Sequence, residues 1–350
     1  MLMDADTPIW PALLGKLMRG EDLAPEEAGG ALAVILEGRA TPAQIAGFAV
    51  ALRAKGETPT ELAALVRTLL AYAERVEVAG PLLDTCGTGG DRSCSINVST
   101  LAALVAAGAG ARVAKHGGRS ASSACGSADL LETLGVAIDL GPAGVARCIE
   151  EVGIGFCYAP RFHSALRHAG PVRRELGVPT TFNFLGPLAN PAGARHQTIG
   201  VGDAAMAERM VATLVELGTE RALVFFGHDG LDELTTTTTS AVWEVIDGDV
   251  RFSNLDPTEL GIPLAAPEDL VGGDPAANAR LARSILEGET GPQRDIVVLN
   301  AAAALLAADL VADLSAGVAA AVASLDGGRA AAALDGLVKV SKQAAAEEAG

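Results

Sequence analysis

Residues 84–91 read Asp-Thr-Cys-Gly-Thr-Gly-Gly-Asp, and residues 95–100 continue with Ser-Ile-Asn-Val-Ser-Thr. An apolar run over 78–83 precedes this stretch, and a segment rich in alanine, leucine and valine over 101–113 follows it. This pattern predicts a strand, a glycine-rich turn and the start of a helix. Glycine permits positive φ and lets an anion approach the backbone N–H groups. The free N–H groups and the dipole of a helix N-terminus also favour a phosphate, so we predict an anion-binding loop.

The spacing of these glycines excludes two common nucleotide-binding loops. A P-loop needs a Lys followed by Ser or Thr after its last glycine, and no Lys follows Gly90. The dinucleotide fingerprint needs Gly-x-Gly-x-x-Gly, and the glycines that begin at Gly87 do not have that spacing. A single glycine-rich turn is also compatible with a tight loop that has only a structural role.

A second polar loop strengthens the phosphate interpretation. Residues 115–123 read Lys-His-Gly-Gly-Arg-Ser-Ala-Ser-Ser and directly follow an apolar run over 111–114 that predicts a strand end. Lys115 would supply a point charge and Arg119 a planar fork for phosphate oxygens. Hydroxyl donors would come from Ser122, Ser123 and Ser127. Two such loops after two strands predict a site for a polyanion.

Composition limits the partners of this chain of 350 residues. Its net charge of −17 repels nucleic acid as a whole, and aromatic residues at 3% are too few for a base-stacking surface. The five cysteines fit no zinc spacing and indicate reduced thiols. The N-terminus lacks a signal-peptide pattern, and no apolar run is long enough to span a membrane. We therefore expect a cytoplasmic protein with no nucleic-acid or membrane partner.

The periodicity predicts an α/β protein with two domains. Residues 10–78 have apolar positions at helical spacing, with helix starts at Asp22 or Pro25, at Thr41-Pro42 and at Thr58-Pro59. We expect a small N-terminal helical domain over 1–80, joined by a further helical segment around 161–190. Over 81–350 we expect a larger α/β domain with a mainly parallel central sheet and flanking helices.

The individual elements of the larger domain follow from short apolar runs that alternate with helical patterns. The predicted strands are 82–84, 112–115, 136–139, 154–158, 198–201, 222–227, 241–246 and 250–254. The predicted helices are 101–109, 126–134, 142–152, 161–169, 204–217 and 274–287. Residues 296–349 read as helices broken at Gly317 and at Gly327-Gly328, with a frayed end over 344–348.

Two adjacent carboxylates, Asp232 and Glu233, follow the predicted strand over 222–227. Neighbouring carboxylates on a loop can share hard divalent cations, and Mg²⁺ bridges such ligands to substrate phosphates. A solvated acidic turn is the alternative. The two phosphate-type loops favour the metal interpretation.

These motifs, in this order, resemble the anthranilate phosphoribosyltransferases, a family grouped with the pyrimidine nucleoside phosphorylases. The resemblance continues through 172–177, 182–191 and 229–233, and it extends from the N-terminal helices to about residue 300. It implies transfer of the phosphoribosyl group of 5-phosphoribosyl 1-diphosphate to the amine of anthranilate, as in tryptophan biosynthesis. It further implies two Mg²⁺ ions, a homodimer formed through the N-terminal helices, and binding of the donor by the domain over 81–350.

The resemblance also implies roles for single residues. Ser99 would ligate one Mg²⁺ and Glu233 would contact both, with Asp232 beside it. Arg173 would pair with the carboxylate of anthranilate, and His116 would lie near its amine, so His116, Lys115 and Arg173 are the predicted catalytic residues. The predicted substrate contacts are Gly87, Gly90, Asp91, Ser95, Asn97, Ser99, Thr100, Lys115, His116, Gly117, Gly118, Arg119, Ser122, Ser123, Ser127 and Arg173.

Three positions depart from the family pattern. Gly118 stands where the family usually has Asn, Arg92 where it has Gly, and Leu166 where an aromatic residue is common. Losing an amide and a ring would enlarge the acceptor pocket, so a different aromatic carboxylate is an alternative acceptor. A nucleoside phosphorylase is a further alternative, but it would need no paired Mg²⁺ carboxylates.

Overall fold

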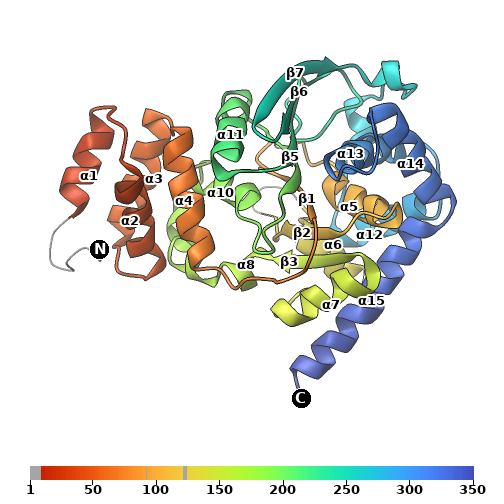
Figure 1. The fold of residues 1–350 in the computed structure, drawn as a ribbon, viewed down its shortest axis with the longest axis horizontal. Coiled ribbons are helices and arrows are strands. Elements are labelled where there is room, and N and C mark those ends of the chain that lie inside the picture. Colours follow the sequence, from red (N-terminus) through yellow and green to blue (C-terminus); the bar gives the residue numbers. More distant parts are fainter. Residues whose placement is uncertain (1–8, 92, 121–123) are drawn as a thin grey trace.

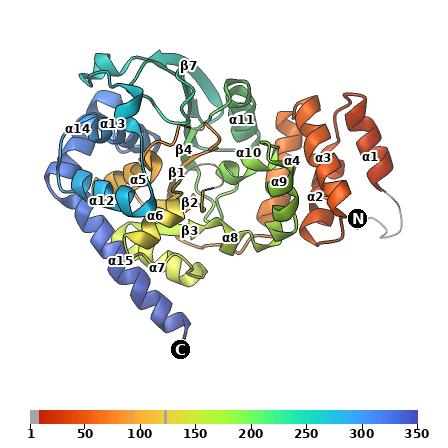
Figure 2. The same ribbon diagram turned by 180° about the vertical axis from the view of Figure 1, so that it is seen from behind.

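A computed structural model of the protein describes residues 9–91, 93–120 and 124–350. The N-terminal helices gather at one end of the molecule, and the sheet with its covering helices forms the rest (Figure 1). Seen from behind, the C-terminal helix runs away from the body of the sheet domain (Figure 2). No helix of the described residues is long and apolar enough to cross a membrane.

Four helices form the N-terminal bundle: α1 (Ile9–Met18), α2 (Pro25–Leu36), α3 (Pro42–Lys55) and α4 (Pro59–Ala71). The predicted starts of the last three are confirmed. Thr41 and Thr58 cap α3 and α4 by accepting hydrogen bonds from backbone N–H groups in the first turn. In both helices a proline follows the cap, where its missing N–H costs no hydrogen bond.

The sheet has seven strands in the order β3-β2-β1-β4-β5-β6-β7. The first five strands in this order pair in parallel, whereas β6 pairs antiparallel with both β5 and β7, so the prediction of a mainly parallel sheet is confirmed. The strands are β1 (Leu83–Gly87), β2 (Val113–Gly117), β3 (Ile154–Tyr158), β4 (His196–Gly200), β5 (Arg221–Gly227), β6 (Ser240–Ile246) and β7 (Asp249–Leu255).

Helices connect these strands and cover the sheet (Figure 1). They are α5 (Val98–Gly108), α6 (Ser127–Thr133), α7 (Pro142–Val152), α8 (Ala159–Phe162), α9 (Gly170–Leu176), α10 (Phe182–Leu188), α11 (Ala204–Leu217), α12 (Pro275–Leu286), α13 (Pro292–Ala307), α14 (Leu314–Asp326) and α15 (Arg329–Glu348). Short 3₁₀ helices cover Ser164–His168, Pro257–Leu260 and Pro267–Leu270.

Two predicted elements are wrong. The strand expected over 136–139 is irregular, because the N–H of Ala137 donates to the Ser341 hydroxyl of α15 instead of to a neighbouring strand. The helix expected over 161–169 is divided into α8 and the 3₁₀ helix Ser164–His168. The division falls at His163, whose backbone is not helical.

The C-terminal helices also differ from prediction at two points. Gly317 does not break the chain but lies inside α14. A Cβ there would come within 2.8 Å of the Ala302 carbonyl oxygen, so the glycine lets α14 pack closely on α13. The break at Gly327-Gly328 is confirmed. The end of α15 is not frayed, since the Glu348 carboxylate accepts a 2.9 Å hydrogen bond from the N–H of Gly141 at the start of α7.

The core consists of two hydrophobic clusters. One lies between the sheet and the helices that include α5, α13 and α15. The other runs from the N-terminal helices through Val172 of α9 and Phe182 of α10 to Ile199 and Val224 in the sheet. The segment around α9 and α10 therefore packs on both the helical bundle and the sheet, which brings its side chains to the strand ends.

Candidate active site

The two glycine-rich loops follow adjacent parallel strands. β1 ends at Gly87 and β2 at Gly117, so both loops leave the same edge of the sheet. Gly89 and Gly90 adopt positive φ, at 65° and 88°, which is the conformation expected of glycine in this turn.

Asp232 lies directly against the first of these loops. The N–H of Gly89 donates to Asp232 Oδ2 at 2.7 Å. A Cβ at Gly87 would come within 2.3 Å of the same carboxylate oxygen, so only glycine allows this approach. The structure thus brings together a phosphate-type loop and an acidic residue 143 positions away in sequence.

Glu233 contacts the start of α5. Its Oε1 accepts a 3.1 Å hydrogen bond from the N–H of Ser99 in the first helical turn. Burial, together with the charge of Asp91, raises the pKa of Asp232 to about 7. Burial also raises the pKa of Glu233, with an added contribution from the charge of Asp232. Two adjacent buried carboxyls that resist ionisation form an environment in which a divalent cation would stabilise the ionised pair.

Lys115 lies beneath the site and not at its surface. It is 2% exposed, and its Nζ donates to the Thr85 carbonyl at 2.5 Å and to the Ser99 hydroxyl at 3.4 Å. Burial lowers the pKa of Lys115, and the charges of Asp84 and Glu233 oppose that shift. The lysine therefore adds positive charge next to the predicted metal ligands.

The oxygen ligands of this region suit Mg²⁺. Within residues 9–91, 93–120 and 124–350, no group of three or more His, Cys, Asp or Glu side chains converges on one metal position. Mg²⁺ commonly uses one or two protein carboxylates and completes its shell with water and substrate phosphates. Asp232, Glu233 and the hydroxyl of Ser99 are hard ligands of that kind, so these residues fit the predicted ion.

His116 follows Lys115 in β2 and contacts a different helix. Its Nδ1 lies 3.1 Å from the Gly186 carbonyl of α10, and a carbonyl only accepts, so Nδ1 carries the proton. Its Nε2 is buried and has no hydrogen-bond partner within the described residues. Burial lowers the pKa of His116 to about 4, so the ring is neutral near pH 7 with a bare Nε2.

His163 was missed by the sequence analysis. Its ring packs edge-on against that of His116 with centroids 5.1 Å apart, and its Nε2 lies 2.9 Å from the Ala189 carbonyl. Burial, together with the neighbouring His116, lowers the pKa of His163 to about 3. Only the fold could identify it, because its partners are 26 and 47 positions from it in sequence.

Acidification should destabilise the fold through these two histidines. Because their folded pKa values of about 4 and about 3 lie below the ordinary 6.5, the unfolded chain binds protons first as the pH falls. The stabilisation is complete above pH 6.5, and below it the free energy of unfolding should fall by about 1.4 kcal/mol per pH unit for each histidine. Urea unfolding between pH 7.5 and pH 5 measures this slope. His163→Gln should reduce it and the exposed His228→Gln should not; an equal slope in all three proteins contradicts the prediction.

Arg173, on α9, has its guanidinium carbon 5.8 Å from the centroid of the Phe182 ring on α10. Burial lowers its pKa. No acidic partner for its guanidinium is found in the described part of the chain. Phe182, which lies under Arg173, and Gly186, which contacts His116, are one turn apart on α10. One helix therefore supports both residues predicted to bind the acceptor.

Other predicted contacts are more constrained than the sequence suggested. Arg119 is paired with Asp129 at 2.7 Å and Glu132 at 2.9 Å, so its fork already binds carboxylates. The Asn97 amide donates to the Cys125 carbonyl and accepts from Asn278, which ties two loops together.

Three more predicted contacts, Ser95, Thr100 and Ser127, lie near the same loops. Thr100 is buried, and its hydroxyl lacks a hydrogen-bond partner among the described residues. Ser95 forms an isolated bridge with Val271, and Ser127 begins α6 beside Gly117. Ser122, Ser123 and Arg92 lie outside the described residues. Leu166 packs against the cluster of the N-terminal helices.

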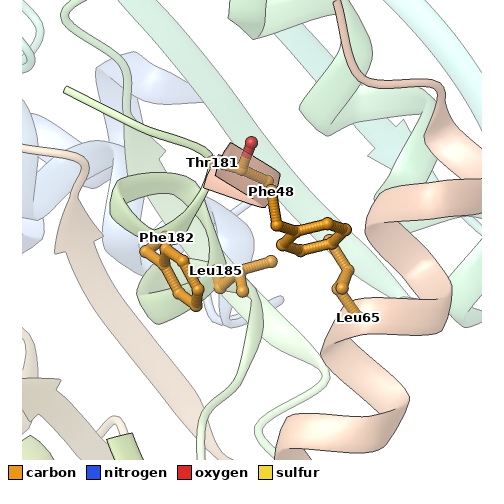
Figure 3. A pocket seen from close by; sticks show the side chains of 5 residues that line it. All are labelled: Phe48, Leu65, Thr181, Phe182 and Leu185. Atoms are coloured by element: carbon orange, nitrogen blue, oxygen red, sulfur yellow. The ribbon is translucent and has the colours of Figure 1, made fainter. Parts of the chain in front are cut away.

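A small apolar pocket lies between α3, α4 and α10, and Figure 3 shows its lining side chains. They are Phe48, Leu65, Thr181, Phe182 and Leu185. None of the five is charged, so this pocket does not suit a polyanion. It lies in the packing interface between the helical bundle and α10. Phe182 takes part in this interface and also contacts the guanidinium of Arg173.

The fold and the site define a class: an α/β enzyme with two glycine-rich loops at one edge of the sheet and a pair of buried carboxyls against them. The helical bundle domain of a glycosyl transferase family matches residues 11–73, and the a/b domain of a glycosyl transferase family matches residues 79–331. The chain is 52% identical over 341 residues to an anthranilate phosphoribosyltransferase from Salinispora arenicola (strain CNS-205), which covers 95% of this chain and 96% of the relative.

Solved structures agree with this match. A crystal structure of anthranilate phosphoribosyltransferase from Thermus thermophilus is 45% identical with a TM-score of 0.89, covering 94% of this chain and 99% of that one. The enzyme of the same name from Saccharomyces cerevisiae, in complex with PRPP and Mg, is 27% identical with a TM-score of 0.88, covering 95% and 98%. The chain belongs to the anthranilate phosphoribosyltransferase family, as its motifs predicted.

Proposed function

We propose that this protein transfers the phosphoribosyl group of 5-phosphoribosyl 1-diphosphate to the amine of anthranilate, in the pathway to tryptophan. The products are N-(5-phosphoribosyl)anthranilate and diphosphate. One observation carries the proposal: both acidic residues accept hydrogen bonds from backbone N–H groups of the segment predicted to bind phosphate. Asp232 accepts from the N–H of Gly89, and Glu233 accepts from the N–H of Ser99. The family membership supports the same donor and acceptor.

The donor side must stabilise a leaving diphosphate while the ribose becomes oxocarbenium-like. Bound Mg²⁺, which we propose as two ions, would neutralise charge on that leaving group. Asp232, Glu233 and Ser99 would hold the metal, and Lys115 would add a positive charge from beneath. The loop glycines and the hydroxyls of Ser95, Ser127 and Thr100 would bind the rest of the donor, so no covalent nucleophile is needed.

The acceptor side must orient an aromatic amine and receive its proton. The guanidinium of Arg173 would bind the carboxylate of anthranilate in its planar fork. The bare Nε2 of His116 is an acceptor, so it would hold the amine by one N–H and accept its proton as the new bond forms. Its low pKa favours release of that proton again.

Loss of anthranilate fluorescence is the direct test of the proposed function. The signal should decline only when 5-phosphoribosyl 1-diphosphate and Mg²⁺ are both present, and a chelator should stop it. If anthranilate is not consumed but a pyrimidine nucleoside is cleaved with phosphate, the protein is a phosphorylase. If a substituted aminobenzoate reacts and anthranilate does not, the alternative acceptor is correct.

Gly118→Asn should improve the use of anthranilate. A Cβ at Gly118 would meet only the Ala159 Cβ at 4.0 Å, so a side chain fits. One added hydrogen bond is worth about 1 kcal/mol, so the KM for anthranilate should fall several-fold. Larger aminobenzoates should then be used comparatively better by the native protein.

The matched control is Gly118→Ala, which fills the space without supplying an amide. kcat/KM for anthranilate and a panel of substituted analogues should separate the three proteins. An unaltered ranking with Asn at position 118 would mean that glycine is a neutral variation in an ordinary acceptor pocket.

We infer a helical domain of residues 1–80 together with 161–190, and a donor-binding domain over 81–350. Packing of α9 on α3 and of α10 on α4 supports this division.

We further propose a homodimer through the N-terminal helices, supported by the exposed Met18 and Val50 on α1 and α3. Light scattering of the native protein and of Met18→Asp tests it. We also propose a cytoplasmic location, where thiols such as those of the buried Cys86, Cys148 and Cys157 stay reduced.

A further inference from the structure

The turn between β5 and β6 carries Asp232 and Glu233. The side chain of Asp229 forms hydrogen bonds to turn residues both before and after that pair. Asp229 Oδ1 accepts a 3.1 Å hydrogen bond from the N–H of Leu231. Its Oδ2 accepts from the hydroxyls of Thr235, at 2.6 Å, and Thr237, at 2.5 Å. Asp229 therefore connects the residue before the acidic pair to two residues after it.

A second side chain holds the turn from outside. Asn300 of α13 accepts from the N–H of Leu234 at 3.0 Å and donates to its carbonyl at 2.9 Å. Its amide also donates to the Ile296 carbonyl at 2.9 Å within the helix. Asn300 is 3% exposed, so water does not compete for these bonds. Both backbone polar groups of the residue that follows Glu233 are thus fixed to the core.

Glycines make room for this arrangement. A Cβ at Gly227 would come within 2.5 Å of Asp229 Oδ1, and a Cβ at Gly200 within 1.6 Å of the Asp232 carbonyl oxygen. The turn is therefore pressed against the ends of β4 and β5. Side chains at either position would displace Asp229 or the acidic pair itself.

We propose that Asp229 and Asn300 are positioning residues, which hold the turn over 230–236 so that Asp232 and Glu233 face the donor and its cation before either binds. The proposal rests on the proposed function of this site. We assign Asp229 a positioning role because both of its oxygens accept hydrogen bonds from donors within the turn itself. Two adjacent buried carboxylates repel each other when both are ionised. The hydrogen bonds of Asp229 and Asn300 would keep the backbone of the turn from moving the two carboxylates apart.

Variants of Asp229 test the inference in the intact protein. Asp229→Ala should raise the Mg²⁺ concentration needed for half-maximal binding of inorganic diphosphate by roughly tenfold, because donors are left without their acceptor. Hydrogen exchange of the amides in 230–236 should become faster by a similar factor. Asp229→Asn keeps one acceptor oxygen and should restore part of both losses.

The matched control is Asp256→Ala. Asp256 makes the same kind of contacts, to the N–H of Thr258 at 2.9 Å and to its hydroxyl at 2.6 Å, in a turn that carries none of the site residues. Its loss should change neither Mg²⁺ dependence nor exchange in 230–236. Thr237→Val removes a single bond to Asp229, so it gives a smaller change of the same sign even if Asp229→Ala does not fold.

Calorimetry with Mg²⁺ and diphosphate, and exchange in the metal-free protein, supply the readouts. Unchanged exchange in 230–236 together with an unchanged Mg²⁺ requirement would overturn the inference. Faster exchange spread evenly over the chain would also overturn it, since it would indicate a general loss of stability. If the native protein leaves anthranilate unconsumed, the proposed function fails, whereas exchange in the metal-free variants still decides the inference.

Discussion

Asp232→Asn and Glu233→Gln should each lower kcat by about a hundredfold or more, even at saturating Mg²⁺. Each change keeps the shape of the side chain and an oxygen that can still accept from Gly89 or Ser99. Only the charge is lost, and an amide cannot hold a divalent cation as a carboxylate does. Initial rates of anthranilate consumption over a wide Mg²⁺ range measure the effect.

Thermal unfolding separates this result from a loss of structure. In the metal-free protein, burial raises the pKa of both carboxyls, so their ionised forms oppose folding. Tm near pH 8 should therefore stay the same or rise in both variants while activity is lost. Asp256→Asn is the control, because Asp256 caps the short helix Pro257–Leu260, which carries none of the site residues. Variants of positions 232 and 233 that retain near-native rates would remove these residues from the metal site.

The local signals in the sequence predicted much of the fold. The strand Ile154–Tyr158 and the helix Pro142–Val152 have the predicted bounds, since a helix-starting proline and a Gly153 in the left-handed conformation mark the helix ends. The errors have partners far away in the chain. The apolar run over 136–139 resembles a strand locally, and only the fold reveals that Ser341 satisfies its backbone.

The candidate site was predicted as a set of positions but not as an arrangement. Lys115 was predicted as the last residue of a strand over 112–115 and His116 as part of the loop after it, yet both lie inside β2, where Lys115 is paired in register with Phe156 of β3. Successive strand residues face opposite sides of a sheet. Lys115 accordingly contacts Ser99 of α5, while the adjacent His116 contacts Gly186 of α10. One short strand thus carries a residue of the proposed donor side and a residue of the proposed acceptor side, which no spacing of motifs could indicate.

Arg173→Ala should reduce kcat/KM for anthranilate by at least about a hundredfold and leave the KM of the donor nearly unchanged. Removing one partner of a desolvated, hydrogen-bonded charge pair costs about 2–5 kcal/mol. Arg173 is held over the Phe182 ring and has no carboxylate partner in the described part of the protein, so the charge is available to a substrate. Arg173→Lys keeps the charge without the planar fork and should recover only part of the loss.

Aniline, which lacks the carboxylate, gives the decisive comparison. If Arg173 binds that group, native protein and Arg173→Ala should use aniline equally poorly, because neither gains from the guanidinium. The matched control is Arg174→Ala, since Arg174 is the exposed neighbour on the same helix and should be replaceable without effect. An equal loss of activity toward anthranilate and aniline would mean that Arg173 supports the packing of α9 on α10, and that the acceptor carboxylate binds elsewhere.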